Sequence, residues 1–519
     1  MSFLNVQPTV SAQTLRALAR YPDRTAFVTD AGAISYAHVT GMLGRIQAVL
    51  AELGLPRGAG VATLSANRWE TWCFAEAAQA SALRTTPLHP LGSLEDHLDQ
   101  LADADIQVLV VDAETYAARG ADLAQKANSV RHVLTLGKAD YGVDLMAAAA
   151  AIGSVTPRNL ARPDDACVLA YTGGTTGKSK GVWRDHRSVS IISPAILADF
   201  ELPSTPHYLA VAPISHVAGT KVLPTLMRGG SITLMKSFDP ERVLQTIERQ
   251  RINFTLLVPT MIYVLLDHPA LGKTDLSSLE LLLYGASPMS PTRLVEGLER
   301  IGPVFSQLYG QSECYPVSLL RKADHDAARP ELFASCGFPL SNCDVALLDE
   351  DGEPVAPGEA GEICVRAPQL MGCYWNRPEQ TEEAFRHGWL HTGDVARADE
   401  RGYLYIVDRM KDMIVTGGFN VYPREVEDAL TSHPGVAMAA VIGVPDAKWG
   451  EAVKALVVRR PGAGVSDEEL IALVKEKKGS TQAPKSVEFT DELPVTPVGK
   501  IDKKVLRARY WADQQRMVG

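Results

Sequence analysis

The sequence predicts an α/β protein with a large N-terminal domain of parallel sheets flanked by helices, a small antiparallel β module, and a small α+β domain at the C-terminus. Three observations lead to this prediction. Short apolar runs alternate with amphipathic stretches over the first two thirds of the chain, strands with Asp-Gly and Pro-Gly turns follow from about residue 338, and a second mixed unit begins near residue 410. The chain of 519 residues is also too long for one ordinary core.

In the N-terminal part, apolar runs of strand length predict buried strands, with amphipathic helices at 239–251 and 291–302 between some of them. The predicted strands are 60–67, 108–113, 208–216, 231–235, 254–259, 279–287 and 304–310. Glycine-rich or hydroxyl-rich segments follow several of these strands. Because ligands of parallel sheets bind at the carboxyl ends of the strands, we expect a site at this edge.

The remaining elements follow from turns and helix caps. After residue 338, Asp-Gly and Pro-Gly turns between alternating strands predict the antiparallel module. Farther on, helices are predicted at 423–434 and 466–478, and strands at 436–444 and 452–460. We therefore expect an N-terminal domain at 1–409 with a β-rich subdomain at 338–409, and a C-terminal domain at 410–519.

Composition excludes several classes of protein. The net charge of −10 argues against a nucleic-acid partner. The apolar stretch at 254–266 is interrupted by threonine and proline and is too short for an integral membrane segment. The N-terminus lacks the basic and apolar regions of a secretory signal, and the seven cysteines form no C-x-x-C pair, so we expect reduced thiols and neither zinc nor disulfides. These features predict a cytoplasmic protein.

The segment LAYTGGTTGKSKGV at 169–182 has the composition of a phosphate-binding loop. Glycines allow close approach of the backbone to a ligand, and successive N–H groups can surround an anion. It is not a P-loop, because that pattern needs glycine at position 172, where this chain has threonine. From composition alone, a flexible surface loop remains the alternative.

Five segments occur in an order that resembles the adenylate-forming (AMP-binding) superfamily, in its acyl-CoA synthetase branch. They are YTGGTTGKSKGV at 171–182, YGASP at 284–288, YGQSE at 309–313, the stretch from GWLHTGD to YPREVE at 388–427, and LPVTPVGKIDKKVLR at 493–507. The resemblance covers nearly the whole chain. It implies that a carboxylate attacks the α-phosphate of ATP, releasing pyrophosphate, and that a thiol then displaces AMP from the acyl-adenylate.

The resemblance also implies a nucleotide site. The implied ATP- and AMP-binding residues are Thr172, Gly173, Gly174, Thr175, Thr176, Gly177, Lys180, Gly285, Ala286, Ser287, Tyr309, Gly310, Gln311, Ser312, Asp394, Arg409 and Lys500. In the loop, Gly173 and Ser179 stand where the family usually has serine and proline. We therefore expect a more flexible loop and weaker ATP binding.

Four residues are implied in catalysis. Lys500 matches the lysine that bridges the attacking carboxylate and the α-phosphate, and Ser312 contacts that phosphate. Glu313 holds Mg²⁺, and an acidic residue suits an ion that keeps several waters. His216 lies beside the carboxylate, although a single histidine after a strand is more often structural.

The same resemblance implies which residues serve the second step, in which the thiol displaces AMP. Gly417 and Gly418 let the pantetheine arm of coenzyme A pass, and Trp449 meets the adenine of CoA or simply packs. The small C-terminal α+β domain is implied to be mobile, with a hinge near Lys411 that alternates it between the two half-reactions.

The function that these motifs predict is an ATP-dependent carboxylic acid–CoA ligase. The segments at 216–221, 284–288 and 311–317 are mostly small or apolar, which favours an aromatic or a medium- to long-chain aliphatic acid. The alternative is a stand-alone adenylating enzyme that loads an acyl carrier protein. A luciferase-like oxidase, a P-loop NTPase and an inactive nucleotide-binding protein are further alternatives. The sequence leaves the oligomeric state open, and the resemblance makes a homodimer one candidate because dimers are common in the family.

Overall fold

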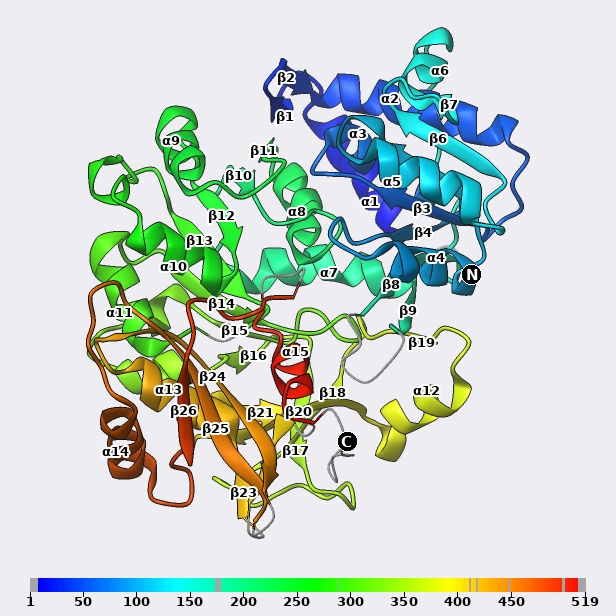
Figure 1. Cartoon of the computed structure of the whole chain (residues 1–519). Helices are drawn as coiled ribbons and strands as arrows, with labels where there is room; N and C mark the ends of the chain where they lie inside the picture. The colour runs from blue at the N-terminus through cyan, green and yellow to red at the C-terminus, as the bar shows by residue number, and fades with distance from the viewer. Residues whose placement is uncertain are drawn as a thin grey trace.

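The computed structural model describes residues 8–172, 179–287, 289–409, 412–416, 419–446, 449–496 and 500–511. It has the predicted architecture: two large, mainly parallel sheets, a small antiparallel module, and a C-terminal α+β domain. In Figure 1 the first large sheet lies at the upper right, the second at the upper left, and the C-terminal domain at the lower left. The predicted fold class is confirmed.

The first sheet has eight strands in the order β19-β9-β8-β4-β3-β5-β6-β7. Its strands are β3 Gly60–Leu64, β4 Arg84–Pro87, β5 Ile106–Asp112, β6 His132–Leu136, β7 Val143–Asp144, β8 Ala166–Tyr171, β9 Gly181–Asp185 and β19 Cys373–Tyr374. The pairs β8–β9 and β9–β19 are antiparallel and the others are parallel. The helices that accompany it are α2 Tyr36–Glu52, α3 Trp69–Ala80, α4 Leu94–Asp103, α5 Ala113–Lys126 and α6 Leu145–Ala151.

The second sheet has nine strands in the order β16-β15-β14-β13-β12-β10-β11-β1-β2, and its middle strands are parallel. Its strands are β1 Thr25–Thr29, β2 Gly32–Ser35, β10 His207–Ala210, β11 Ser231–Leu234, β12 Phe254–Leu257, β13 Leu281–Gly285, β14 Phe305–Tyr309, β15 Ser318–Leu320 and β16 Phe338–Pro339. Its helices are α1 Val10–Arg20, α7 His186–Asp199, α8 Val222–Met227, α9 Pro240–Gln250, α10 Pro259–Asp267 and α11 Pro291–Arg300. Short 3-10 helices lie at Val217–Lys221, Leu271–Lys273, Lys322–Asp324, Pro330–Ala334 and Arg386–Gly388.

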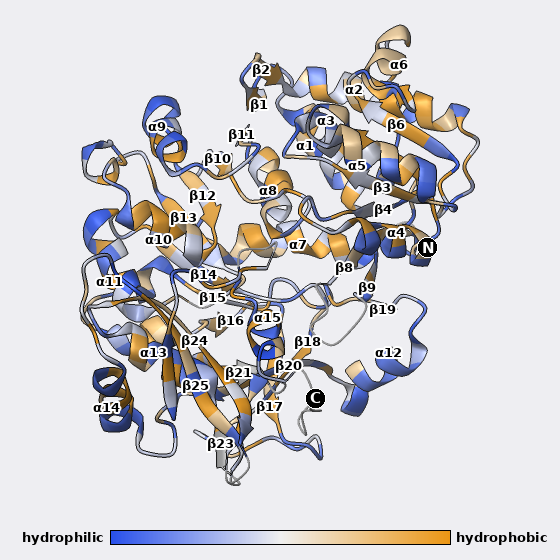
Figure 2. Ribbon diagram, viewed as in Figure 1, coloured by the Kyte–Doolittle hydropathy of each residue, from blue (hydrophilic) through white to orange (hydrophobic). Residues whose placement is uncertain are grey.

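One apolar core joins the two large sheets. It contains Val61 and Val108 from the first sheet and Phe27, Tyr208 and Phe254 from the second, all fully buried. Helices α7 and α8 contribute to the same core, and Figure 2 shows α7 as largely hydrophobic. The two sheets therefore pack together through a shared core.

The strand predicted at 208–216 is shorter than expected, because β10 ends at Ala210. Pro213 follows and has no N–H for a sheet ladder. The chain then forms the 3-10 helix Val217–Lys221, with His216 at its N-cap. The strand predicted at 279–287 also ends early, at Gly285, because Ala286 has a left-handed φ of 66°.

The antiparallel module has the strand order β17-β18-β20-β21. Its strands are β17 Asp344–Leu348, β18 Gly361–Arg366, β20 Leu390–Ala398 and β21 Leu404–Arg409, and helix α12 Pro378–Ala384 lies beside it. The β20–β21 pairing places Asp394 opposite Arg409 in the backbone register. The module therefore brings part of the GWLHTGD motif next to the end of the predicted N-terminal domain.

The C-terminal domain has a sheet of order β23-β22-β25-β24, with β26 paired to β25. Its elements are β22 Ile414–Thr416, β23 Phe419–Val421, α13 Pro423–Thr431, β24 Val436–Asp446, β25 Gly450–Arg459, α14 Asp467–Lys478, β26 Ser486–Phe489 and α15 Lys503–Ala508. The predicted cap of α14 is present, because Ser466 and Glu469 form a capping box. The domain has its own buried core, which includes Ile414, Val441 and Val453.

None of the helices in the described part of the chain is long and apolar enough to cross a membrane.

Candidate active site

The ends of β13 and β14 form the first part of the site. Gly285 ends β13 opposite Leu308 of β14, and a Cβ atom at Gly285 would lie 2.4 Å from the carbonyl oxygen of Leu308. Only glycine therefore fits at this position, and the left-handed Ala286 turns the chain directly afterwards. The predicted small residues at 285 and 286 are explained by this tight backbone packing.

Three predicted nucleotide-binding residues meet at one carboxylate. The Tyr309 hydroxyl donates to Asp394 Oδ2 at 2.8 Å, and Gln311 Nε2 donates to the same oxygen at 2.6 Å. Gln311 Nε2 also donates to the carbonyl oxygen of Thr392 at 2.9 Å. Burial and the neighbouring Asp394 raise the pKa of Tyr309, so its hydroxyl remains a donor. Asp394 itself is buried, which suits an acceptor fixed in one orientation.

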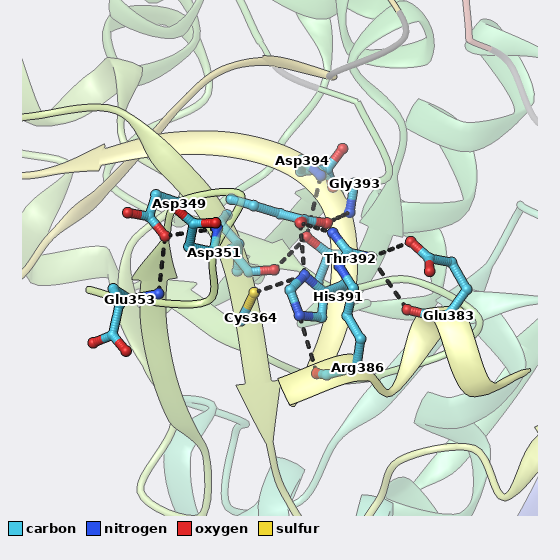
Figure 3. A network of polar contacts seen from close by, with 12 residues as sticks. Asp349, Asp351, Glu353, Cys364, Glu383, Arg386, His391, Thr392, Gly393 and Asp394 are labelled. Carbon is cyan, nitrogen blue, oxygen red and sulfur yellow. Dashed lines mark hydrogen bonds and ion pairs between the residues drawn. The ribbon is translucent and has the colours of Figure 1, made fainter. Parts of the chain in front are cut away.

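A buried polar cluster braces the strand that carries Asp394. Glu362 Oε1 accepts from the backbone N–H of Gly393 at 2.7 Å, and its Oε2 accepts from Arg386 Nη2 at 2.9 Å. Oε2 also lies 2.7 Å from His391 Nδ1. Figure 3 shows the His391 ring between the Cys364 sulfur and the backbone of Arg386, on the strand that leads to Asp394.

Glu362, Cys364 and His391 offer ligand atoms within 4.8 Å of one another, as in a metal site. Two observations argue against that use. The Arg386 guanidinium already neutralises Glu362, and burial raises the pKa of the Cys364 thiol to about 12, which disfavours the thiolate that metals bind. The cluster is a structural support for the neighbouring Asp394. Sequence reasoning missed it because its members are spread over three elements.

Glu313, the predicted Mg²⁺ residue, meets an aromatic residue that no motif indicated. The Tyr374 hydroxyl donates to Glu313 Oε1 at 2.8 Å, and Oε2 accepts no hydrogen bond from the residues that the structure describes. Lys180 Nζ lies 4.7 Å from the centre of the Tyr374 ring. Tyr374 therefore connects the metal candidate to the end of the glycine-rich loop. It lies in a two-residue strand outside every motif, so no sequence pattern marks it.

Ser312 is held through its backbone. Its carbonyl oxygen accepts from Arg184 Nη2 at 2.6 Å, and its side chain is exposed. Arg184 lies on β9 and is buried, which lowers the pKa of its guanidinium. The exposed hydroxyl is free to turn towards a ligand, as the predicted phosphate contact requires.

The base of the glycine-rich loop is closed by hydrogen bonds. The Thr172 N–H donates to the carbonyl oxygen of Lys180 at 3.0 Å, and Ser179 Oγ accepts from Gln100 Nε2 at 3.4 Å. The predicted phosphate-binding residues between them, Gly173, Gly174, Thr175, Thr176 and Gly177, lie outside the described residues. Their role stays a prediction.

His216 follows β10 and is half-buried. Its Nδ1 lies 2.8 Å from Ser215 Oγ, and its ring centre lies 4.5 Å from that of His89. Burial and the neighbouring His89 lower the pKa of His216 to about 4, so the imidazole is neutral at pH 7. Sequence reasoning did not single out His89, which follows β4 of the other sheet.

Lys500, which is predicted for adenylation, and the residues that are predicted for the CoA step lie in the C-terminal domain. The Lys500 N–H donates to Thr496 Oγ1 at 3.1 Å, and its carbonyl oxygen accepts from the Thr496 N–H at 2.6 Å. Trp449 is 41% exposed, which leaves its ring accessible to a ligand. Lys411, Gly417 and Gly418, and the side chain of Arg409, lie outside the described residues. The place of Lys500 in the site stays a prediction.

Two protein-family models match the sequence of this chain. The AMP-binding enzyme model matches residues 15–375, and the AMP-binding enzyme C-terminal domain model matches residues 425–500. The chain belongs to the AMP-binding enzyme family.

Known relatives agree with this membership. The medium/long-chain-fatty-acid–CoA ligase FadD8 of Mycobacterium tuberculosis is 48% identical over 485 residues, which are 90% of this chain and 84% of the relative. A feruloyl-CoA synthase of an Amycolatopsis species is 39% identical over 498 residues, which are 94% of this chain and 96% of the relative. The amide bond synthetase McbA of Marinactinospora thermotolerans has a similar structure, with a TM-score of 0.90, 36% identity, and coverage of 96% of this chain and 100% of McbA. The predicted membership of the adenylate-forming superfamily, in its acyl-CoA synthetase branch, is confirmed.

Proposed function

We propose that this AMP-binding enzyme joins a carboxylic acid to coenzyme A at the expense of ATP. The observation that carries the proposal is the convergence of Tyr309 and Gln311 on Asp394, close to Glu313 in the same chain segment. This cluster follows the carboxyl end of β14, where ligands of parallel sheets bind. It offers a buried carboxylate for sugar hydroxyls, an aromatic ring and a second carboxylate for a cation.

In the first half-reaction, a carboxylate oxygen of the acid attacks the α-phosphorus of ATP. The bond from that phosphorus to the bridging oxygen breaks, and pyrophosphate leaves. Asp394 accepts from the ribose hydroxyls, Arg409 lies by the ribose and phosphate, and the Ser312 hydroxyl donates to the α-phosphate. Lys500 neutralises charge on both anions, which is where a positioned cation lowers the barrier most.

The same residues fit a magnesium ion. Glu313 is half-buried, and Oε1 is held by the Tyr374 hydroxyl, which leaves Oε2 for the water shell that Mg²⁺ keeps beside phosphates. When bound, the ion would neutralise charge on the phosphate oxygens. Lys180 and the glycine-rich loop supply the remaining positive field around the leaving pyrophosphate.

In the second half-reaction, the CoA thiol loses its proton and its sulfur attacks the acyl carbon of the acyl-adenylate. The bond from that carbon to the phosphate oxygen breaks, and AMP leaves. We assign Gly417 and Gly418 to passage of the pantetheine arm and Trp449 to contact with CoA; its exposed ring supports this role. The C-terminal domain, residues 410–519, would rotate about a hinge near Lys411 between the two steps. Its separate core supports independent movement relative to residues 1–409.

The acid is aromatic or a medium- to long-chain aliphatic acid. The names of the relatives FadD8 and feruloyl-CoA synthase support both classes. The acceptor is CoA, and a carrier protein that bears a phosphopantetheine arm is the alternative. All seven cysteines are free thiols, which supports a reducing cytoplasmic location. A monomer and a homodimer are both compatible with the proposed function.

The test is a pyrophosphate-release screen with fatty acids of increasing length, benzoates and cinnamates, followed by mass spectrometry of the products. We expect acyl-CoA and AMP in equal amounts with at least one of these acids. Acyl-adenylate that forms without any CoA thioester, but is transferred to a carrier protein, would favour the alternative acceptor. Release of ADP or inorganic phosphate instead of AMP and pyrophosphate would overturn the proposal.

A further inference from the structure

Two histidines from different sheets lie face to edge. His89 follows β4 of the eight-stranded sheet, and His216 follows β10 of the nine-stranded sheet. Their ring centres are 4.5 Å apart, with an angle of 72° between the ring planes. The loops after parallel strands of both sheets therefore meet at this point, where α/β proteins bind their ligands.

Asn67 fixes the position of the His216 loop relative to the first sheet. This buried residue follows β3, and its Nδ2 donates to the carbonyl oxygens of Ala212 and Met235, each at 3.0 Å. Its Oδ1 accepts from the Ile214 N–H at 2.8 Å. The two histidines thus approach each other across a fixed junction.

Hydrogen bonds fix both the turn that carries His89 and the tautomer of its ring. The carbonyl oxygen of His89 accepts from the Gly92 N–H at 2.9 Å and contacts His97 Nε2 at 2.9 Å. The Leu91 N–H donates to His89 Nδ1 at 3.1 Å. Because Nδ1 accepts, the proton of the neutral ring is on Nε2. Burial and the neighbouring His97 lower the pKa of His89 to about 4, so this neutral tautomer prevails at pH 7.

The Nε2–H group of His89 is buried and has no hydrogen-bond partner among the residues that the structure describes. The ring of His325, another buried histidine, differs, because its nitrogens contact the Tyr284 hydroxyl at 2.9 Å and the carbonyl oxygen of Arg321 at 2.7 Å. An unsatisfied buried donor costs roughly 1–3 kcal/mol. A contact with the face of the His216 ring would recover little of that cost. His89 is therefore a rigid, neutral donor at a junction of loops, and it lacks an acceptor.

We propose that His89 Nε2–H donates to an oxygen of the substrate's carboxylate, next to His216. This inference rests on the proposed ligase function and adds a substrate-contacting residue to it. A neutral donor suits the task, because it holds the carboxylate without neutralising it as an ion pair would. The second carboxylate oxygen stays nucleophilic towards ATP. His216 and His89 then approach the same group from the two sheets.

Two substitutions separate this role from support of the turn. His89→Asn keeps an acceptor near the position of Nδ1 for the Leu91 N–H and removes the distal donor. His89→Gln restores an amide N–H near the reach of Nε2. We expect His89→Asn to lower kcat/KM for the acid roughly 10- to 100-fold, as for loss of a hydrogen bond to a charged group. The KM for ATP should change less than about threefold, and His89→Gln should recover most of the activity.

The exposed His38 gives the control, since His38→Asn changes the same side chain on α2 and should leave all constants unchanged. Wild-type turnover tests the ligase function, and the ratio of variant to wild type tests His89, so the two failures are distinguishable. An unchanged kcat/KM in His89→Asn would overturn the inference. Equal losses for acid and ATP without rescue by glutamine would overturn it too, because they indicate a structural role.

A measurement on the wild-type protein covers the case in which the variants do not fold. With ¹⁵N-labelled histidine, the His89 Nε2–H signal should move downfield when the acid is added in excess without ATP. A signal that stays in place at a saturating concentration of an acid that the enzyme turns over would contradict the proposed contact.

Discussion

The nucleotide cluster of the large domain and the C-terminal domain that carries Lys500 are supported in different ways. Asp394 receives hydrogen bonds from Tyr309 and Gln311, and its strand is braced by Glu362. These residues come from the nine-stranded sheet and the antiparallel module. The cluster is therefore fixed by contacts between distant parts of the chain before any ligand arrives.

Lys500 is supported locally. Its backbone bonds to Thr496, and α15 is tied to the same domain by ion pairs of Lys503 with Glu427 at 2.8 Å and Arg507 with Asp412 at 2.7 Å. The C-terminal domain also contacts the large domain: Arg424 Nη2 donates a hydrogen bond to the carbonyl oxygen of Met289 at 3.3 Å. One half of the site is thus held by contacts between distant segments, and we propose that the other half moves as a unit, as two half-reactions at one site require.

The strongest test of this difference is Lys500→Ala. We expect adenylation, measured by pyrophosphate release, to fall roughly 100- to 1000-fold, as for loss of a positioned donor to the transition state. Thioester formation from supplied acyl-AMP should be nearly unchanged, because the C-terminal domain then presents another face. The exposed Lys504 provides the control substitution to alanine. Equal losses in both half-reactions would mean that the domain does not alternate.

A substitution in the nucleotide cluster of the large domain should affect ATP binding instead. Asp394→Asn removes the charge that we expect to accept from the ribose, while Tyr309 and Gln311 can still donate to the amide oxygen. The KM for ATP should rise roughly 10- to 100-fold, with little change in the KM for the acid. Asp399→Asn, at the end of the β20–β21 hairpin, is the matched control, since Asp399 bonds to Arg401 at 2.9 Å. A change in the KM for the acid alone would contradict the assignment of Asp394.

The sequence predicts the fold class and most large elements, because periodicity and caps are local properties. The helix at 239–251 is an example: Asp239 caps α9, and Pro240 starts it. Motifs also predict Tyr309, Gln311 and Asp394 as neighbours in one site. The turns after residue 338 predict the antiparallel module, but no local pattern predicts the packing that places Asp394 beside Tyr309 and Gln311.

The site residues that no sequence pattern predicted share one property. Tyr374, Arg184 and His89 act through contacts with residues far away in the chain, and none lies in a motif. A tyrosine in a two-residue strand or an arginine in a buried strand has no local pattern that marks its role. Such residues become visible only when tertiary packing places them against a predicted site residue.

The brace below Asp394 offers a smaller test of the preorganised half. Glu362→Gln keeps an acceptor for the Gly393 N–H but weakens the bonds to Arg386 and His391. We expect the free energy of unfolding to fall by about 1–3 kcal/mol and the KM for ATP to rise a few-fold. Urea denaturation and steady-state kinetics measure the two effects. Glu353→Gln, at an exposed position nearby, should change neither, and an unaffected Glu362→Gln would show that the cluster does not support the site.

The pH dependence of the folding stability offers a test that concerns the large domain alone. Burial raises the pKa of Glu76 on α3 to about 7, and the carboxyl group accepts from the Thr14 hydroxyl at 2.7 Å. The folded state binds this proton more tightly than the unfolded state. The stabilisation is therefore fully present below the unfolded pKa of about 4.5 and is lost as the pH rises through about 7.

Glu76→Gln mimics the protonated form and should remove this dependence. The free energy of unfolding of the variant minus that of wild type should rise by on the order of 2 kcal/mol when the pH is raised from 5 to 8.5. Glu52→Gln, at an exposed position on α2, should show no such gain. Because the C-terminal domain has a separate core, a protease-sensitivity assay should find its local stability unchanged by Glu76→Gln. A shift in both regions together would mean that the two cores unfold as one unit, and the proposed independent movement of the C-terminal domain would lose its structural basis.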